Sequence, residues 1–163
     1  MEKHCLSLLV ENNFGVLSRI SGLFARRGYN IDSLTVGTTE NPKISRITMV
    51  VTGDERILEQ IKKQLNKLIN IIKVVELREG ESIRRELVFI KVKANNQTRS
   101  NIVEISNLFR ANVVDVSKNS LVLEVTGNRD KVDAFLEMIE PFGILEFVRS
   151  GETGLQRGKN EIK

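Results

Sequence analysis

Side chains that could carry acid-base, nucleophilic or metal chemistry are few in this sequence. Its 163 residues include one histidine, one cysteine and one tyrosine, and neither a Gly-x-Ser-x-Gly nor a His-Glu-x-x-His motif occurs. Cys5 has no second cysteine with which to form a disulfide, and the pair His4 and Cys5 lacks the second ligand pair of a zinc site. We therefore expect neither catalytic residues nor a bound metal ion in this chain.

One stretch offers binding chemistry instead. The apolar run Leu6–Val10 stops at Asn12, Asn13 and Gly15, and an amphipathic helix pattern begins directly afterwards. The first N–H groups of such a helix have no partner within it and lie at the positive end of its dipole, so a carboxylate can bind there. No basic residue follows until Arg19, and no glycine-rich phosphate motif is present. This favours a ligand that brings its own positive charge.

A zwitterionic amino acid meets both conditions. Its carboxylate can accept hydrogen bonds from the N–H groups of Gly15–Leu17, and its ammonium group needs an oxygen such as the amide oxygen of Asn12 or Asn30. Ile31 and Val36 offer apolar surface to its side chain. The same residues also have a purely structural explanation, because asparagine is common in turns and caps and glycine can serve backbone geometry alone. From these residues alone, both explanations remain open.

Strands and helices alternate twice along the chain. The first half predicts strands at 4–10, 31–37, 45–52 and 71–77, with helices at 16–27 and after 54. The second half predicts strands at 86–94, 112–116, 121–126 and 144–148, with helices at 98–110 and 128–139. We therefore expect an α+β fold of two βαββαβ units. The second half has no Asn-Asn-Phe-Gly turn, so we expect the binding site only in the first.

Composition shifts indicate the domain boundaries. The charged stretch 79–85 lacks periodicity and predicts a linker between a first domain, 1–78, and a second, 86–149. Residues 150–163 carry glycines and charges without periodicity and predict a mobile or partner-ordered tail. Strands with apolar residues on both faces, such as Leu6–Val10, suggest that something covers the face opposite the helices. We expect a second copy of the chain to do so.

The overall composition is that of a soluble globular protein, with 40% hydrophobic and 28% charged residues. No apolar run approaches the length of a membrane span, and the stretch before the first strand is too short for a signal peptide, so we expect a cytoplasmic protein without membrane contact. The net charge of +4 leaves a nucleic-acid-binding module as the alternative. Such modules stack bases on strand aromatics, and the strands here offer mainly Phe89 and Phe147, for which a place in the core is the plainer explanation, so we expect no salt-sensitive RNA binding.

The sequence also resembles a known family over nearly the whole chain. The patterns Leu9–Ile20 and Leu23–Val36 resemble the ACT domain of the small, regulatory subunit of acetolactate synthase (acetohydroxyacid synthase). The likeness continues through Ser45–Arg46, Gln60–Leu68 and Arg149–Gly151. The resemblance implies that both units are ferredoxin-like and that the first is an ACT domain.

The resemblance further implies a non-catalytic subunit in branched-chain amino acid (valine, leucine, isoleucine) biosynthesis. Such a subunit forms a homodimer through its ACT domain, activates the catalytic (large) subunit and confers feedback inhibition by a branched-chain amino acid, for which valine is expected. Thiamine diphosphate, magnesium and FAD are expected in that partner, and no cofactor in this chain. The implied effector-binding residues are Asn12, Gly15, Val16 and Leu17 from one protomer, facing Asn30, Ile31 and Val36 from the other.

Overall fold

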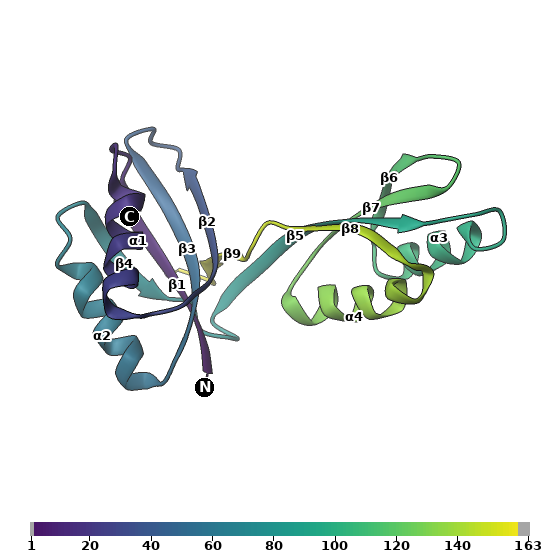
Figure 1. Cartoon of the computed structure of the whole chain (residues 1–163). Coiled ribbons are helices and arrows are strands. Elements are labelled where there is room, and N and C mark those ends of the chain that lie inside the picture. The colour runs from purple at the N-terminus through teal and green to yellow at the C-terminus, as the bar shows by residue number, and fades with distance from the viewer. Residues whose placement is uncertain (1, 160–163) are drawn as a thin grey trace. The chain divides into compact units, whose positions relative to one another are not determined.

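The computed structural model describes residues 2–159, which form two compact units (Figure 1). Unit 1 takes the chain up to Ile83 and again from Glu152 onward, and unit 2 comprises Arg84–Gly151. Each unit contains the βαββαβ order that the sequence predicts. The α+β fold of two such units is therefore confirmed. None of the helices in the described part of the chain is long and apolar enough to cross a membrane.

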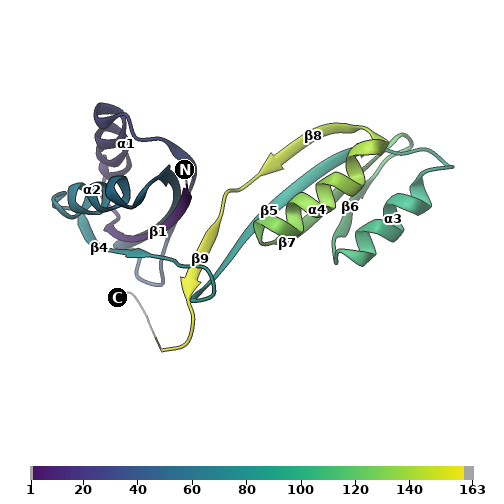
Figure 2. The ribbon, with the colours of Figure 1, turned by 90° about the horizontal axis from the view of Figure 1, so that it is seen from below.

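Unit 1 is an antiparallel sheet in the order β2-β3-β1-β4, with both of its helices on one side (Figure 2). Its elements are β1 (Glu2–Glu11), α1 (Val16–Arg27), β2 (Ile31–Thr38), β3 (Ile44–Gly53), α2 (Glu55–Asn66), β4 (Ile71–Glu76) and a C-terminal strand, β9 (Thr153–Gln156).

Local signals explain where the helices of unit 1 begin and end. Gly28 adopts the left-handed conformation with φ 68°, and its N–H donates to the Ala25 carbonyl, which closes α1. The side chain of Asp54 accepts a hydrogen bond of 2.8 Å from the N–H of Ile57 and caps α2. These are the end of α1 and the start of α2 that the sequence predicts.

The core of unit 1 lies between the sheet and the two helices. Alternate residues of β1 face the helices, and Leu6 and Leu8 stand opposite Met49 and Ile47 of β3 in the antiparallel register. The apolar face of α1 packs on them through Val16, Ile20, Leu23 and Phe24, all of them buried.

The other face of this sheet is also buried, and Cys5, Val50 and Leu77 form a small apolar cluster on it. β9 lies on this side, opposite the helices (Figure 2), and the Thr35 hydroxyl of β2 donates to the Glu152 carbonyl at 3.2 Å. A regular strand thus occupies part of the stretch 150–163, where the sequence indicated an unpatterned tail. It lies on the face for which we expected a second copy as cover.

Unit 2 has the sheet order β6-β7-β5-β8, and β9 pairs with β5 off this path. Its elements are β5 (Ser82–Lys93), α3 (Arg99–Leu108), β6 (Asn112–Val116), β7 (Ser120–Gly127), α4 (Arg129–Ile139), the short 3-10 helix Glu140–Phe142 and β8 (Ile144–Arg149). Phe135 of α4 and Val88, Ile90 and Val92 of β5 belong to one apolar core and are all fully buried. Because β5 already begins at Ser82, the stretch 79–85 that we expected as a linker includes the first residues of a strand.

Candidate functional site

The turn after β1 is fixed to the loop between β2 and β3. The backbone N–H of Asn12 donates to the Lys43 carbonyl at 2.7 Å, and its side-chain Nδ2 donates to the Pro42 carbonyl at 2.9 Å. The Nδ2 of Asn13 donates to a carboxylate oxygen of Glu11 at 2.8 Å. Because Asn12 uses its amide nitrogen in this way, its Oδ1 remains the atom of that side chain that can accept from a ligand.

Gly15 has a conformational reason to be glycine. Its φ of 85° and ψ of −2° lie in the left-handed region, which other L-residues adopt at a cost. A Cβ atom added to Gly15 would meet no heavy atom within 4 Å. The space beside the helix start is therefore open, and both explanations from the sequence, backbone geometry and ligand approach, apply to the same residue.

The start of α1 has no cap from a side chain within the described residues, and its first turn contains no acidic residue. Val16 is buried in the core, and its N–H group already donates to the Asn13 carbonyl at 3.4 Å, a long hydrogen bond that a ligand would have to replace. The Leu17 side chain is 41% exposed beside it. Because no side chain caps the positive end of the helix, a carboxylate bound there could accept hydrogen bonds from the N–H groups of the first turn.

The other predicted site residues lie on β2, the strand that follows α1, or directly before it. Asn30 is exposed, and its Nδ2 donates to a carboxylate oxygen of Asp32 at 2.7 Å. Ile31 is partly buried against the core, and the Val36 side chain is 49% exposed.

Within one chain, the structure does not bring Asn30 and Ile31 to Gly15. Ile31 pairs with Val51, which pairs with His4, so the start of β2 is level with the start of β1. The turn lies at the other end of β1, about 23 Å away for seven residues at 3.3 Å each. Val36 is nearer the turn, since its partner Ile47 pairs with Leu8.

The corresponding turn of unit 2 is built differently. The side-chain oxygen of Asn95 accepts hydrogen bonds from the N–H groups of Gln97 and Thr98, both at 2.9 Å. The N–H groups before α3 are therefore already paired. No glycine occupies this turn, so it lacks the features that make the start of α1 a candidate site.

The two aromatic residues considered for nucleic-acid stacking lie on opposite faces of the sheet in unit 2. Phe89 pairs with Val148 on the face away from the core, whereas Phe147 pairs with Ile90, which is fully buried on the core face. A stacking platform needs its aromatic rings on one face. The geometry therefore gives the nucleic-acid alternative no support.

Phe14 is a residue that the sequence did not single out for a role. It lies in the turn between Asn13 and Gly15, and its side chain is fully exposed, at 103%. Ile69, 88% exposed, lies next to Asn70, whose carbonyl accepts from the Glu11 N–H at the same end of the sheet. The sequence pattern does not show whether this phenylalanine is buried or exposed. Its exposure in the structure is what indicates a contact surface.

Comparisons with known proteins cover nearly the whole chain. A family described as the AHAS small subunit-like ACT domain matches residues 6–73, and one described as the small subunit of acetolactate synthase matches residues 85–158. The "Probable acetolactate synthase small subunit" of Archaeoglobus fulgidus is 52% identical over 159 residues, which are 98% of this chain and 99% of that protein. The "Acetolactate synthase small subunit" of Mycobacterium bovis is 55% identical over 98% of this chain and 95% of its own.

A solved structure is similar over the same length. The crystal structure of the acetolactate synthase small subunit from Thermotoga maritima matches with a TM-score of 0.90 and 36% sequence identity, covering 98% of this chain and all of that one. Both the order of the elements and the division into two units therefore have a counterpart in a solved protein.

Proposed function

Because this chain belongs to the family of acetolactate synthase small subunits, we propose that it regulates a separate catalytic subunit. It activates that subunit and makes it sensitive to feedback inhibition by a branched-chain amino acid, and valine is the expected effector. The chain contributes no catalytic residue. Thiamine diphosphate, magnesium and FAD belong to the catalytic partner in this proposal.

The uncapped start of α1 at Gly15 is the observation that carries the proposal. No side chain caps this helix start, so the N–H groups of its first turn suit a carboxylate, which would replace the 3.4 Å hydrogen bond from Val16 to the Asn13 carbonyl, and the open space beside Gly15 allows close approach. A phosphate would call for basic side chains, and the turn has none before Arg19, whose guanidinium donates to Asn70. An amino acid supplies its own cation, and the Oδ1 of Asn12 is an acceptor for it.

A second copy of the chain completes the site in this proposal. Within the described residues, β2 pairs only with β3, so its other edge is available for a strand. If two β2 strands pair antiparallel about a two-fold axis at their middle, Ile31 of the partner subunit stands opposite Thr38. Thr38 is level with Val10, close to the turn, because both pair with Ser45. The dimer therefore brings the start of one β2 toward the Gly15 turn of the other copy.

Reconstitution with the catalytic subunit of the same organism tests this function. Acetolactate formation is measured against the concentration of this chain and then against valine. We expect activity to rise until the two subunits are equimolar and to fall again as valine is added. A catalytic subunit that neither gains activity nor acquires valine inhibition would refute the regulatory role.

A thermal-shift screen against all amino acids tests the effector class on this chain alone. A ligand at roughly 100 times its Kd stabilises the folded state by about 2.7 kcal/mol, so its effect on Tm is measurable. Valine, isoleucine and leucine differ by methylene groups worth about 1 to 3 kcal/mol each, so the ranking identifies the preferred side chain. If only charged or aromatic amino acids raise Tm, the branched-chain assignment is wrong while a ligand site remains.

A further inference from the structure

Two apolar side chains lie exposed at one end of unit 1, the end away from the N-terminus (Figure 1). Phe14 follows β1 and is 103% exposed, and Ile69 precedes β4 and is 88% exposed. They lie at the same end because Ile71, at the start of β4, pairs with Val10 near the end of β1. Among residues 2–159 they are the most exposed of the large apolar side chains. Exposed apolar groups that lie together mark a contact surface.

A polar network fixes the two loops to each other. The Nδ2 atoms of Asn13 and Asn70 donate to the same carboxylate oxygen of Glu11, at 2.8 and 3.1 Å. The Glu11 N–H donates to the Asn70 carbonyl at 2.9 Å, and Arg19 of α1 donates to the Asn70 side chain. The two asparagines are the direct neighbours of the exposed apolar residues in the sequence. The network therefore holds both apolar residues on one surface.

Basic groups outnumber acidic groups around this surface. The segments that meet at this end of the unit, residues 11–19, 40–43 and 67–73, contain four basic and two acidic residues. Lys43 lies in the loop that accepts the hydrogen bonds of Asn12, and Lys67 is the C-cap of α2, two residues before Ile69. Both lysines are exposed, and neither forms an ion pair with another residue of the described part of the chain. The surface is thus apolar with a positive border.

A second copy of the chain does not account for this surface. The proposed dimer uses the edge of β2, whereas Ile69 precedes β4 at the opposite edge of the sheet order β2-β3-β1-β4. Three strand spacings of about 4.8 Å separate the two edges by about 14 Å. A two-fold contact of the surface with itself would also bring its positive border against a like charge, which opposes association.

We propose that Phe14 and Ile69 anchor this chain on its catalytic subunit, in an apolar depression bordered by acidic side chains. This inference rests on the proposed regulatory function and adds the surface of contact. An aromatic side chain buries about 150 to 250 Å². A stable interface takes about 800 Å² from each partner, so the two anchors form its centre and the polar network and the lysines its border.

The position of the surface connects it with the effector site. Phe14 directly precedes Gly15, so one turn offers backbone N–H groups to the effector and a side chain to the catalytic subunit. Arg19, in the second turn of α1, is hydrogen-bonded to Asn70 beside the second anchor. A change at the start of α1 is therefore in direct contact with both parts of the surface.

Binding of the full-length chain to the catalytic subunit tests the anchors, with the Kd measured by calorimetry. Phe14→Ser and Ile69→Ser are compared with Leu108→Ser, which removes a side chain that is 76% exposed at the end of α3. Truncation of a central anchor costs about 30-fold or more in affinity. We expect about this loss for Phe14→Ser, about tenfold for Ile69→Ser and no change for Leu108→Ser.

A matched pair of charge reversals tests the positive border. Lys67 and Lys3 are both exposed lysines of unit 1 without an ion pair in the described residues, but Lys3 pairs with Thr52 at the opposite end of the sheet. We expect Lys67→Glu to weaken binding about three- to tenfold at low salt, and Lys3→Glu to bind like the wild type. The difference should shrink as added salt screens the charges.

The outcomes separate the surface from the function on which it rests. Wild-type affinity of Phe14→Ser and Ile69→Ser for a catalytic subunit that the wild-type chain activates would overturn the docking surface and leave the regulatory function intact. An equal loss in Leu108→Ser would also overturn it, because the effect would then not be local. A wild-type chain that neither binds nor activates the catalytic subunit would overturn both proposals. Ile69→Ser should keep the Tm increase caused by valine, and its loss would place Ile69 in the effector site instead.

Discussion

Substitution of Gly15 by aspartate separates the two explanations for this glycine. The new carboxylate would stand at the start of α1, where the effector carboxylate is proposed to bind. If that site is real, Gly15→Asp should abolish valine inhibition while the protein still folds and activates the catalytic subunit. If the glycine serves backbone geometry alone, the variant should lose stability and leave the valine response of the folded fraction unchanged.

The structure gives the size of both effects. A non-glycine residue in the left-handed conformation costs about 1 to 2 kcal/mol, and aspartate tolerates it better than most. An acidic group at a helix N-terminus stabilises the fold by roughly 0.3 to 1 kcal/mol, and the added Cβ meets no atom within 4 Å. The net loss of about 1 kcal/mol lowers the Tm of a unit of this size by about 4 to 8 °C. The fold should survive it.

The effect on the effector is larger. Two carboxylates about 4 Å apart repel each other by about 4 kcal/mol at an effective dielectric constant of about 20. Since about 1.4 kcal/mol corresponds to a tenfold change, valine affinity should fall by about three orders of magnitude. Gly15→Asn adds similar bulk without the charge, so the difference between the two variants measures the electrostatic part.

The assay is acetolactate formation by the reconstituted pair against valine concentration, with circular dichroism as the folding control. Gly28→Asn is the matched control, because Gly28 also has a positive φ and open space around its Cβ position but lies at the other end of α1. It should cost similar stability and leave inhibition intact. An unchanged inhibition curve for folded Gly15→Asp would move the site away from this turn. Loss of inhibition in Gly28→Asn would show that the response depends on stability alone.

Three further predictions follow from the same geometry. Mixing Gly15→Asp with Asn30→Ala chains should restore part of the valine inhibition that each variant loses alone, because each mixed dimer has one intact site. If mixed dimers verified by mass spectrometry show no recovery of inhibition, the site is not shared between copies. Phe14→Ser should change the urea midpoint little, since the side chain is fully exposed, yet raise the concentration of this chain needed for half-maximal activation of the catalytic subunit. The lowered pKa of Glu76 stabilises the fold above its ordinary value of 4.5, and this contribution is lost as pH falls through the lower value of the folded state. The wild type should therefore lose more stability between pH 7 and pH 3 than Glu76→Gln, and equal losses in urea titrations would show that Glu76 contributes nothing.

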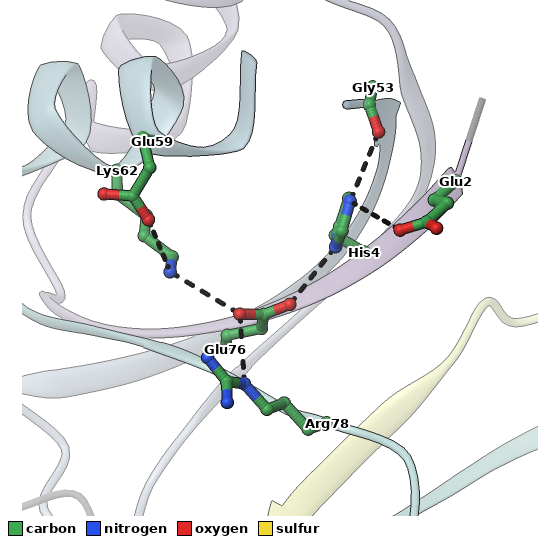
Figure 3. A network of polar contacts seen from close by, with 7 residues as sticks. All are labelled: Glu2, His4, Gly53, Glu59, Lys62, Glu76 and Arg78. Carbon is green, nitrogen blue, oxygen red and sulfur yellow. Dashed lines mark hydrogen bonds and ion pairs between the residues drawn. The ribbon is translucent and has the colours of Figure 1, made fainter. Parts of the chain in front are cut away.

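The elements of this fold were predictable from the sequence because their ends carry local signals. Gly28, Asp54 and Asn128 mark helix boundaries through contacts with residues only a few positions away. The course of the chain after β8 carries no such signal. β9 pairs with β5, the residue before it, Glu152, accepts a hydrogen bond from Thr35, and nothing local in the four residues of β9 indicates a strand. The hydrogen bonds of His4 to Glu76 and to the Gly53 carbonyl (Figure 3) were equally hidden, since they depend on the registers of β1 with β3 and β4.

The spacing of the proposed effector residues carries information about the assembly itself. In a strand-helix-strand connection, the helix returns along the length of the first strand, so the end of β1 and the start of β2 lie at opposite ends of the sheet. Asn12 and Asn30 flank α1 in this way, and a helix of 12 residues is about 18 Å long. One amino acid is too small to touch both residues of one chain. If both residues serve one ligand, the second must come from another copy whose β2 runs in the opposite direction. A two-fold pairing of the β2 edges provides this without any rearrangement of the unit. The effector proposal and the dimer proposal therefore depend on each other, and a monomeric chain that still binds valine through both asparagines would be incompatible with this fold.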